Sequence, residues 1–165
     1  MHLMQTLRCA LGVSSEDKMS DYIRVFCRSS RLIALTEITE FIKDGVYFEE
    51  EPRFDPPLND VEGDWQRLTV FYQPETRPIV LHKNAGDPLM HEEIAEISAG
   101  AAEGLHRRLQ ETAQTITIEI HLSALTEEAW EMLDSLEAYL ARTYDGIVSV
   151  DGEGFYDAAL HWITK

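Results

Sequence analysis

Residues 115–122, TITIEIHL, alternate apolar and polar side chains without a break. A period of two predicts a β-strand with one face buried against a core and one polar face. Residues 22–28, YIRVFCR, alternate in the same way, and residues 68–73 and 78–83 are typical of a hairpin around the turn PETR. The chain must therefore build a sheet that buries one of its faces.

Three helices are predicted from apolar residues that recur every three or four positions. The first ends at Gly45, which we expect to be its left-handed cap. The second carries a stripe from Met90 to Leu105, in which the small residues of the segment 99–104 allow either a close approach to the sheet or a kink. The third contains Trp130 in its apolar stripe and begins after Thr126, a good N-cap residue.

The order of these elements predicts an α+β fold, in which helices pack on one face of a mainly antiparallel sheet, as in a ferredoxin-like sandwich with extra strands. A chain of 165 residues suffices for one ordinary core. We expect residues 1–20 to be an N-terminal extension and residues 21–165 to be a single domain. Within it, residues 22–55 and 116–157 share a weak internal repeat of strand, helix and Asp-Gly turn.

The acidic residues are concentrated, and they exclude some partners. The formal net charge is -16, and residues 44–64 hold eight acidic residues against Arg53, which is a net charge of -7. Such a charge disfavours nucleic acid and anionic membrane surfaces, so a basic protein partner is the natural complement. The residues expected to bind it are Glu49, Glu50, Glu51, Phe54, Asp55 and Asp60.

Two motifs that suggest chemistry have plainer interpretations. Residues 144–157, YDGIVSVDGEGFYD, do not have the ligand spacing of an EF-hand loop, and we predict a hairpin whose turn is DGEG. Cys27 shares its strand face with Val25, which favours a buried structural thiol over a reactive one.

The polar face of the sheet is the second candidate site, with Arg24, Phe26, Arg28 and Glu119 as its sheet-face residues. His82, His121 and His161 also fall on polar positions of predicted strands. If those strands are neighbours, three imidazoles and Glu119 suffice for a zinc site. Histidines that face water, or that line a surface for another subunit, are the alternatives.

These patterns favour a small acidic binding or regulatory protein that engages a basic partner, in the manner of an immunity or inhibitor protein. The alternative is an enzyme or a binder of a small molecule or metal on the polar sheet face. No spacing indicates a nucleophile with its base and orienting group, and no motif predicts a cofactor. The N-terminus does not resemble a secretory signal and no window resembles a membrane span, so we expect a cytoplasmic location. The sequence also leaves a homodimer open.

Overall fold

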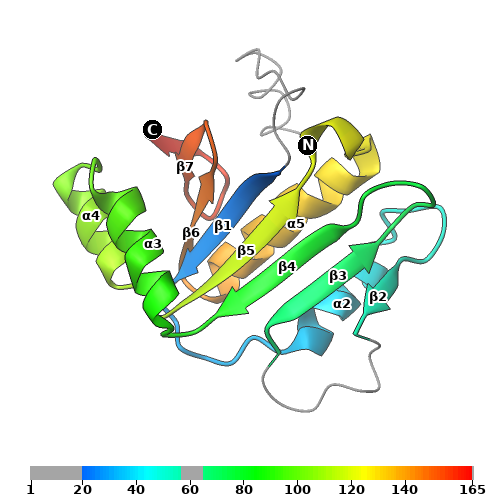
Figure 1. The fold of residues 1–165 in the computed structure, drawn as a ribbon, viewed down its shortest axis with the longest axis horizontal. Coiled ribbons are helices and arrows are strands. Elements are labelled where there is room, and N and C mark those ends of the chain that lie inside the picture. The colour runs from blue at the N-terminus through cyan, green and yellow to red at the C-terminus, as the bar shows by residue number, and fades with distance from the viewer. Residues whose placement is uncertain (1–19, 57–64, 165) are drawn as a thin grey trace.

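The computed structural model describes residues 20–56 and 65–164, and these form an α+β structure with eight strands in one antiparallel sheet and four helices (Figure 1). The strands are β1 (Asp21–Cys27), β2 (Arg53–Asp55), β3 (Arg67–Phe71), β4 (Ile79–Asn84), β5 (Gln114–Ile120), β6 (Gly146–Val150), β7 (Gly154–Tyr156) and β8 (Trp162–Thr164). The helices are α2 (Leu35–Asp44), α3 (Pro88–Ser98), α4 (Glu103–Gln110) and α5 (Glu127–Thr143). The predicted extension, apart from Ser20, and Asp60 lie outside the described residues. The predicted internal repeat and domain limits stay predictions.

The sheet has the strand order β2-β3-β4-β5-β1-β6-β7-β8, so the two strands with the clearest alternation lie at its centre. β1 and β5 pair along their whole length, from Asp21 opposite Ile120 to Cys27 opposite Gln114. The predicted hairpin of β3 and β4 is confirmed, with Leu68 opposite Leu81. Local alternation identified β1 and β5 because Arg24, Thr117 and Glu119 are less buried than the apolar side chains on either side of them.

Helices α2 and α5 cover one face of the sheet and form the main core with it (Figure 1). Ile118 and Val25 contribute from the strands, and Leu133 and Trp130 from α5. Trp130 is buried, as its stripe predicts. The Thr126 side chain accepts a hydrogen bond from the Ala129 amide at 3.2 Å, which confirms the predicted N-cap.

Helices α3 and α4 pack on the opposite face, so the expectation of helices on one face only is wrong. Their apolar side chains, among them Met90 and Leu109, surround Phe26, Ile147 and Phe155 in a second core cluster. Phe26 was expected on an accessible polar face, but it is fully buried there. The reason is that β6 and β7 place further apolar side chains beside Phe26, and this apolar patch needs its own cover.

The predicted single helix from Met90 to Leu105 is wrong as well, because the chain breaks at residues 99–102. α3 ends at Ser98, whose carbonyl accepts a hydrogen bond from the Ala101 amide at 3.0 Å. α4 then begins at Glu103 and returns to the same cluster through Leu105. The small side chains in this segment offer little packing that could hold a continuous helix.

The stretch DGEG forms the predicted turn between β6 and β7, with Val150 opposite Gly154. Gly152 and Gly154 have φ angles of 78° and 121°, which glycine adopts without strain. No helix within the described residues is long and apolar enough to cross a membrane.

Candidate functional site

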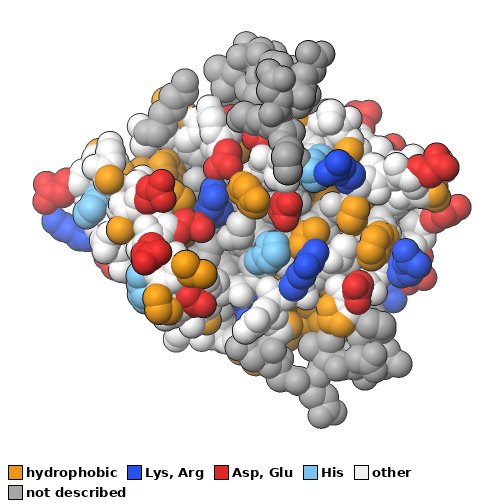
Figure 2. Space-filling model, in the orientation of Figure 1, with side chains coloured by type: hydrophobic (Ala, Val, Ile, Leu, Met, Phe, Trp, Pro, Cys, Tyr) orange, Lys and Arg blue, Asp and Glu red, His pale blue; other side chains and the backbone are white. Residues whose placement is uncertain are grey.

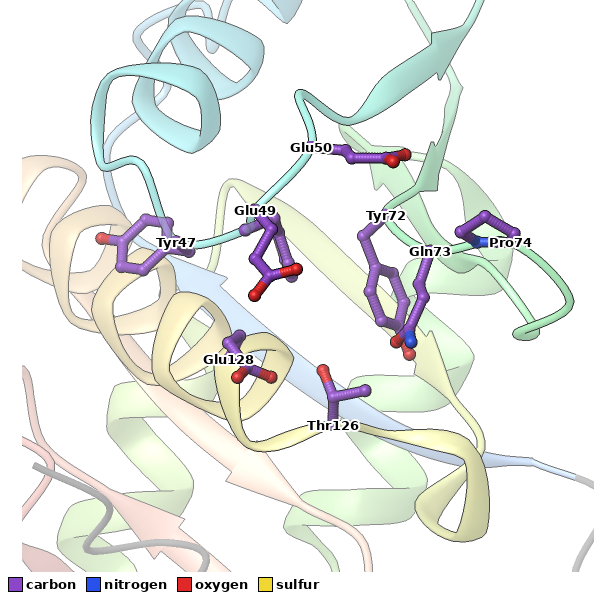
Figure 3. A pocket seen from close by; sticks show the side chains of 9 residues that line it. Tyr47, Glu49, Glu50, Tyr72, Gln73, Pro74, Thr126 and Glu128 are labelled. Carbon is purple, nitrogen blue, oxygen red and sulfur yellow. The ribbon is translucent and has the colours of Figure 1, made fainter.

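A pocket of about 440 Å³ opens between the segment after α2, the end of β3 and the start of α5 (Figure 3). We call it the acidic pocket. It is lined by Tyr47, Phe48, Glu49, Glu50, Tyr72, Gln73, Pro74, Thr126 and Glu128. Two of the predicted partner-binding residues, Glu49 and Glu50, therefore lie at a cavity.

The chain turns sharply after α2 to place Tyr47 at this pocket. Gly45 has a φ of -71°, and Val46, with a φ of 48°, is the residue in the left-handed region. The prediction of Gly45 as a left-handed cap is therefore wrong. Gly45 is needed for another reason, because a Cβ there would lie 2.1 Å from Cε2 of Tyr47.

The aromatic wall of the pocket is tied to the core. The rings of Phe48 and Tyr72 lie 5.2 Å apart between centroids, and both pack against the main cluster. The Tyr72 hydroxyl donates a hydrogen bond to the Ala124 carbonyl at 3.2 Å, and burial raises the pKa of this hydroxyl. The wall is thus held in place from behind.

The carboxylates of the acidic pocket are exposed, and the pocket lining contains no Lys, Arg or His among the described residues. Glu128 lies in the first turn of α5, where the helix dipole stabilises negative charge. Glu51, just outside the lining, is neutralised by Lys43 at 2.8 Å. Carboxylates beside aromatic rings are suited to a cationic side chain, which both groups attract.

Phe54 was expected to contact a partner, but it is buried in the core beneath β2. The cause is the alternation of β2, which turns Arg53 and Asp55 outward and Phe54 inward. Asp55 is exposed, as a partner contact requires.

The second candidate site is the side of β3, β4 and β5 that faces away from α2 and α5, which we call the open face (Figure 1). Across it, Arg67 lies opposite His82, His82 opposite Thr117, and Thr117 opposite Arg24. Arg24 is bound by Glu93 at 2.6 Å and by Asp151 at 2.7 Å, so its charge is already neutralised.

Arg28 lies beyond the end of β1 and takes no part in the open face. Its guanidinium donates two hydrogen bonds of 2.9 Å to Asp145 and one of 3.1 Å to Glu111. This guanidinium holds the pKa of the Asp145 carboxyl below its usual value. Arg28 therefore joins the ends of β1 and α5 and is not free to bind a ligand.

The histidines of the zinc hypothesis are not brought together. His82 Nε2 lies 3.6 Å from the Glu119 carboxylate, whereas His121 Nε2 accepts a hydrogen bond from Arg77 at 3.2 Å. His161 precedes β8, and β1, β6 and β7 lie between β5 and β8. In residues 20–56 and 65–164 no group of three or more His, Cys, Asp or Glu side chains can hold a metal ion, so the predicted zinc site is not formed.

Cys27 is fully buried, as predicted, and its thiol donates to the Val25 carbonyl at 3.8 Å. Burial raises the pKa of the thiol to about 12. Because the thiolate is the nucleophile, Cys27 is inert at neutral pH.

Several residues at these two sites carry no recognisable signal in the sequence. Tyr47, Tyr72 and Glu128 come from three distant segments, and Arg67 and Arg77 belong to no motif. The alternation of β3 could have indicated Arg67, because it places this side chain on the side of the strand that faces away from the main core.

Comparison with known proteins finds no matching family model, no similar curated protein and no similar solved structure.

Proposed function

We propose that this chain is a small cytoplasmic binding or regulatory protein that accepts a basic segment of a protein partner in the acidic pocket, as an immunity or inhibitor protein does. The observation that supports the proposal is the pocket itself, where Glu49, Glu50 and Glu128 stand beside three aromatic rings and no basic side chain. Its volume of about 440 Å³ is within the usual range of ligand pockets.

Arginine is the side chain that this lining suits best. Its flat guanidinium can stack on Tyr47 or Tyr72 while it donates hydrogen bonds to a carboxylate. The net charge of -16 adds a long-range attraction that accelerates encounter with a basic protein.

The enzyme alternative has weaker support. A hollow of about 560 Å³ beside α3 contains His82, Thr117 and Glu93. Its described lining includes neither serine nor cysteine, and Thr117 is its one hydroxyl. A base without an activated nucleophile favours binding over covalent catalysis.

We also propose a ferredoxin-like core made of β4, β5, β1 and β6 with α2 and α5, to which β2, β3, β7 and β8 are added. The order β4-β5-β1-β6 and the common face of the two helices support it. In this arrangement the two strand–helix–strand units interlock. β5 lies between β1 and β4 of the first unit, and β1 lies between β5 and β6 of the second.

Binding of a fluorescent arginine-rich peptide, followed by anisotropy at low and high salt, tests the function. Glu49→Gln and Glu128→Gln should each weaken binding about three- to tenfold, because each removes a charged acceptor. Glu131→Gln is the matched control, since Glu131 is an exposed carboxylate on α5 that does not line the pocket.

Gly45→Ala provides a test that leaves charge unchanged. The new methyl group must displace the Tyr47 ring and should weaken peptide binding, although the backbone angle accepts alanine. If pocket and control variants bind alike, or if salt has no effect, the acidic pocket is not the binding site.

A further inference from the structure

The face of the molecule seen in Figure 2 has two neighbouring regions that differ in charge. Acidic side chains gather over α3, and two groups of histidine with a basic side chain lie over the open strands. On α3 the exposed carboxylates are those of Glu92 and Glu96. On the open face the basic groups are Arg67 beside His82, and Arg77 beside His121.

The two arginines of the open face are available to a partner. Neither Arg67 nor Arg77 forms an ion pair with any described residue, whereas Arg24, Arg28 and Arg108 all do. Arg77 instead donates to the His121 ring at 3.2 Å.

Glu119 lies between these two groups and is already engaged. It accepts a hydrogen bond from the Ser20 hydroxyl at 2.9 Å and lies 3.6 Å from His82. It therefore reduces the positive charge at the centre of the open face but leaves both arginines available.

The same face also has a raised part and a lower part. α3 and α4 stand over β1, β6 and β7 through the second core cluster, and no helix of the described residues lies over β3, β4 and β5 beside them (Figure 1). Leu89, in the first turn of α3, is 67% exposed and lines the hollow that also holds His82 and Thr117. An apolar side chain thus stands at the boundary between a raised acidic helix and a lower basic sheet.

We propose that a second copy of this chain docks on this face as a two-fold dimer, in which α3 of each copy lies on the open face of the other. A two-fold axis parallel to the face, between its two halves, places each acidic helix over the partner's arginines and makes the same contact twice. In this dimer the Leu89 side chain of each copy would be buried against the other copy. The acidic pocket takes no part in this interface.

Charge complementarity selects this partner over others. At this face a purely basic partner would place like charges against Arg67 and Arg77, and a purely acidic partner would place like charges against the carboxylates of α3. A second copy carries both the carboxylates of α3 and the arginines of the open face, so each can lie opposite its complement. Repulsion between the net charges of the two copies is largely screened beyond about 8 Å at physiological salt. Contacts between individual side chains therefore decide whether the dimer forms.

Sedimentation velocity over a range of concentrations tests the proposal with four single variants of the full chain. Arg67→Glu and Glu96→Arg each place like charges opposite each other twice and should raise the dimer dissociation constant about tenfold or more. Arg142→Glu and Glu131→Arg make the same charge changes at exposed positions on α5, across the sheet, and should leave it unchanged.

The decisive measurement mixes Arg67→Glu and Glu96→Arg in equal amounts. In the mixed dimer the new carboxylate of one variant faces the new guanidinium of the other, and the second contact is the natural one, so association should recover. Recovery also shows that both variants are folded. A wild-type protein that stays monomeric, a dimer insensitive to these variants, or a mixture that does not associate would overturn the proposal.

Discussion

Replacement of Val46 by glycine should stabilise this protein. Val46 has a φ of 48°, in the left-handed region where a residue with a Cβ is strained. Such a conformation costs about 1 to 3 kcal/mol. The side chain is 79% exposed, so little packing is lost when it is removed. Glycine also makes the unfolded chain more flexible, which lowers the free energy of unfolding by about 0.5 to 1 kcal/mol. The net increase in the free energy of unfolding is therefore about 1 kcal/mol.

Chemical denaturation of wild type and Val46→Gly measures this gain as a shift in the free energy of unfolding. The melting temperature should rise by about 2 to 4 °C for a chain of this size. Val46→Ala is the control, because it removes the two methyl groups but keeps the Cβ that causes the strain, and it should change the free energy by less than about 0.5 kcal/mol. A Val46→Gly variant that is less stable than wild type would refute the reasoning. It would mean that the strain is absent or that the exposed side chain stabilises the fold in another way.

Three further outcomes are expected. Trp130→Ala should lose about 3 to 5 kcal/mol in chemical denaturation, because the ring lies in the main core; a loss below about 1 kcal/mol would contradict its burial. In a Cys9→Ser background, Cys27 should react with a thiol reagent at pH 8 about 100-fold faster in denaturant than in the folded protein, since burial raises its pKa to about 12; equal rates would show an accessible thiol. Arg28 lowers the pKa of Asp145, so this carboxylate stabilises the fold above about pH 4, and its contribution is lost as the pH falls through the folded-state pKa. Asp145→Asn should accordingly be less stable than wild type at pH 7, and the difference should shrink as the pH falls through the folded-state pKa. A difference that stays the same in acid would rule out the ion pair as its cause.

Much of the local structure could be read from the sequence. The alternation of residues 115–122, the cap at Thr126 and the glycines of DGEG each depend on neighbours within a few positions. Backbone geometry decides these features wherever the segment lies in the fold. The burial of Trp130 and Cys27 follows from the same short-range periodicity.

The two candidate sites were decided by tertiary structure. Tyr47, Tyr72 and Glu128 meet because α2, β3 and α5 pack together, and Arg67 lies opposite His82 because of the register between β3 and β4. Periodicity states which face of a segment is buried, but it does not state what buries it. Phe26 shows the difference, since its position in β1 is outward from the main core and yet lies beneath α3 and α4. Strand order and the placement of helices depend on contacts between distant segments, and those contacts leave no period in the sequence.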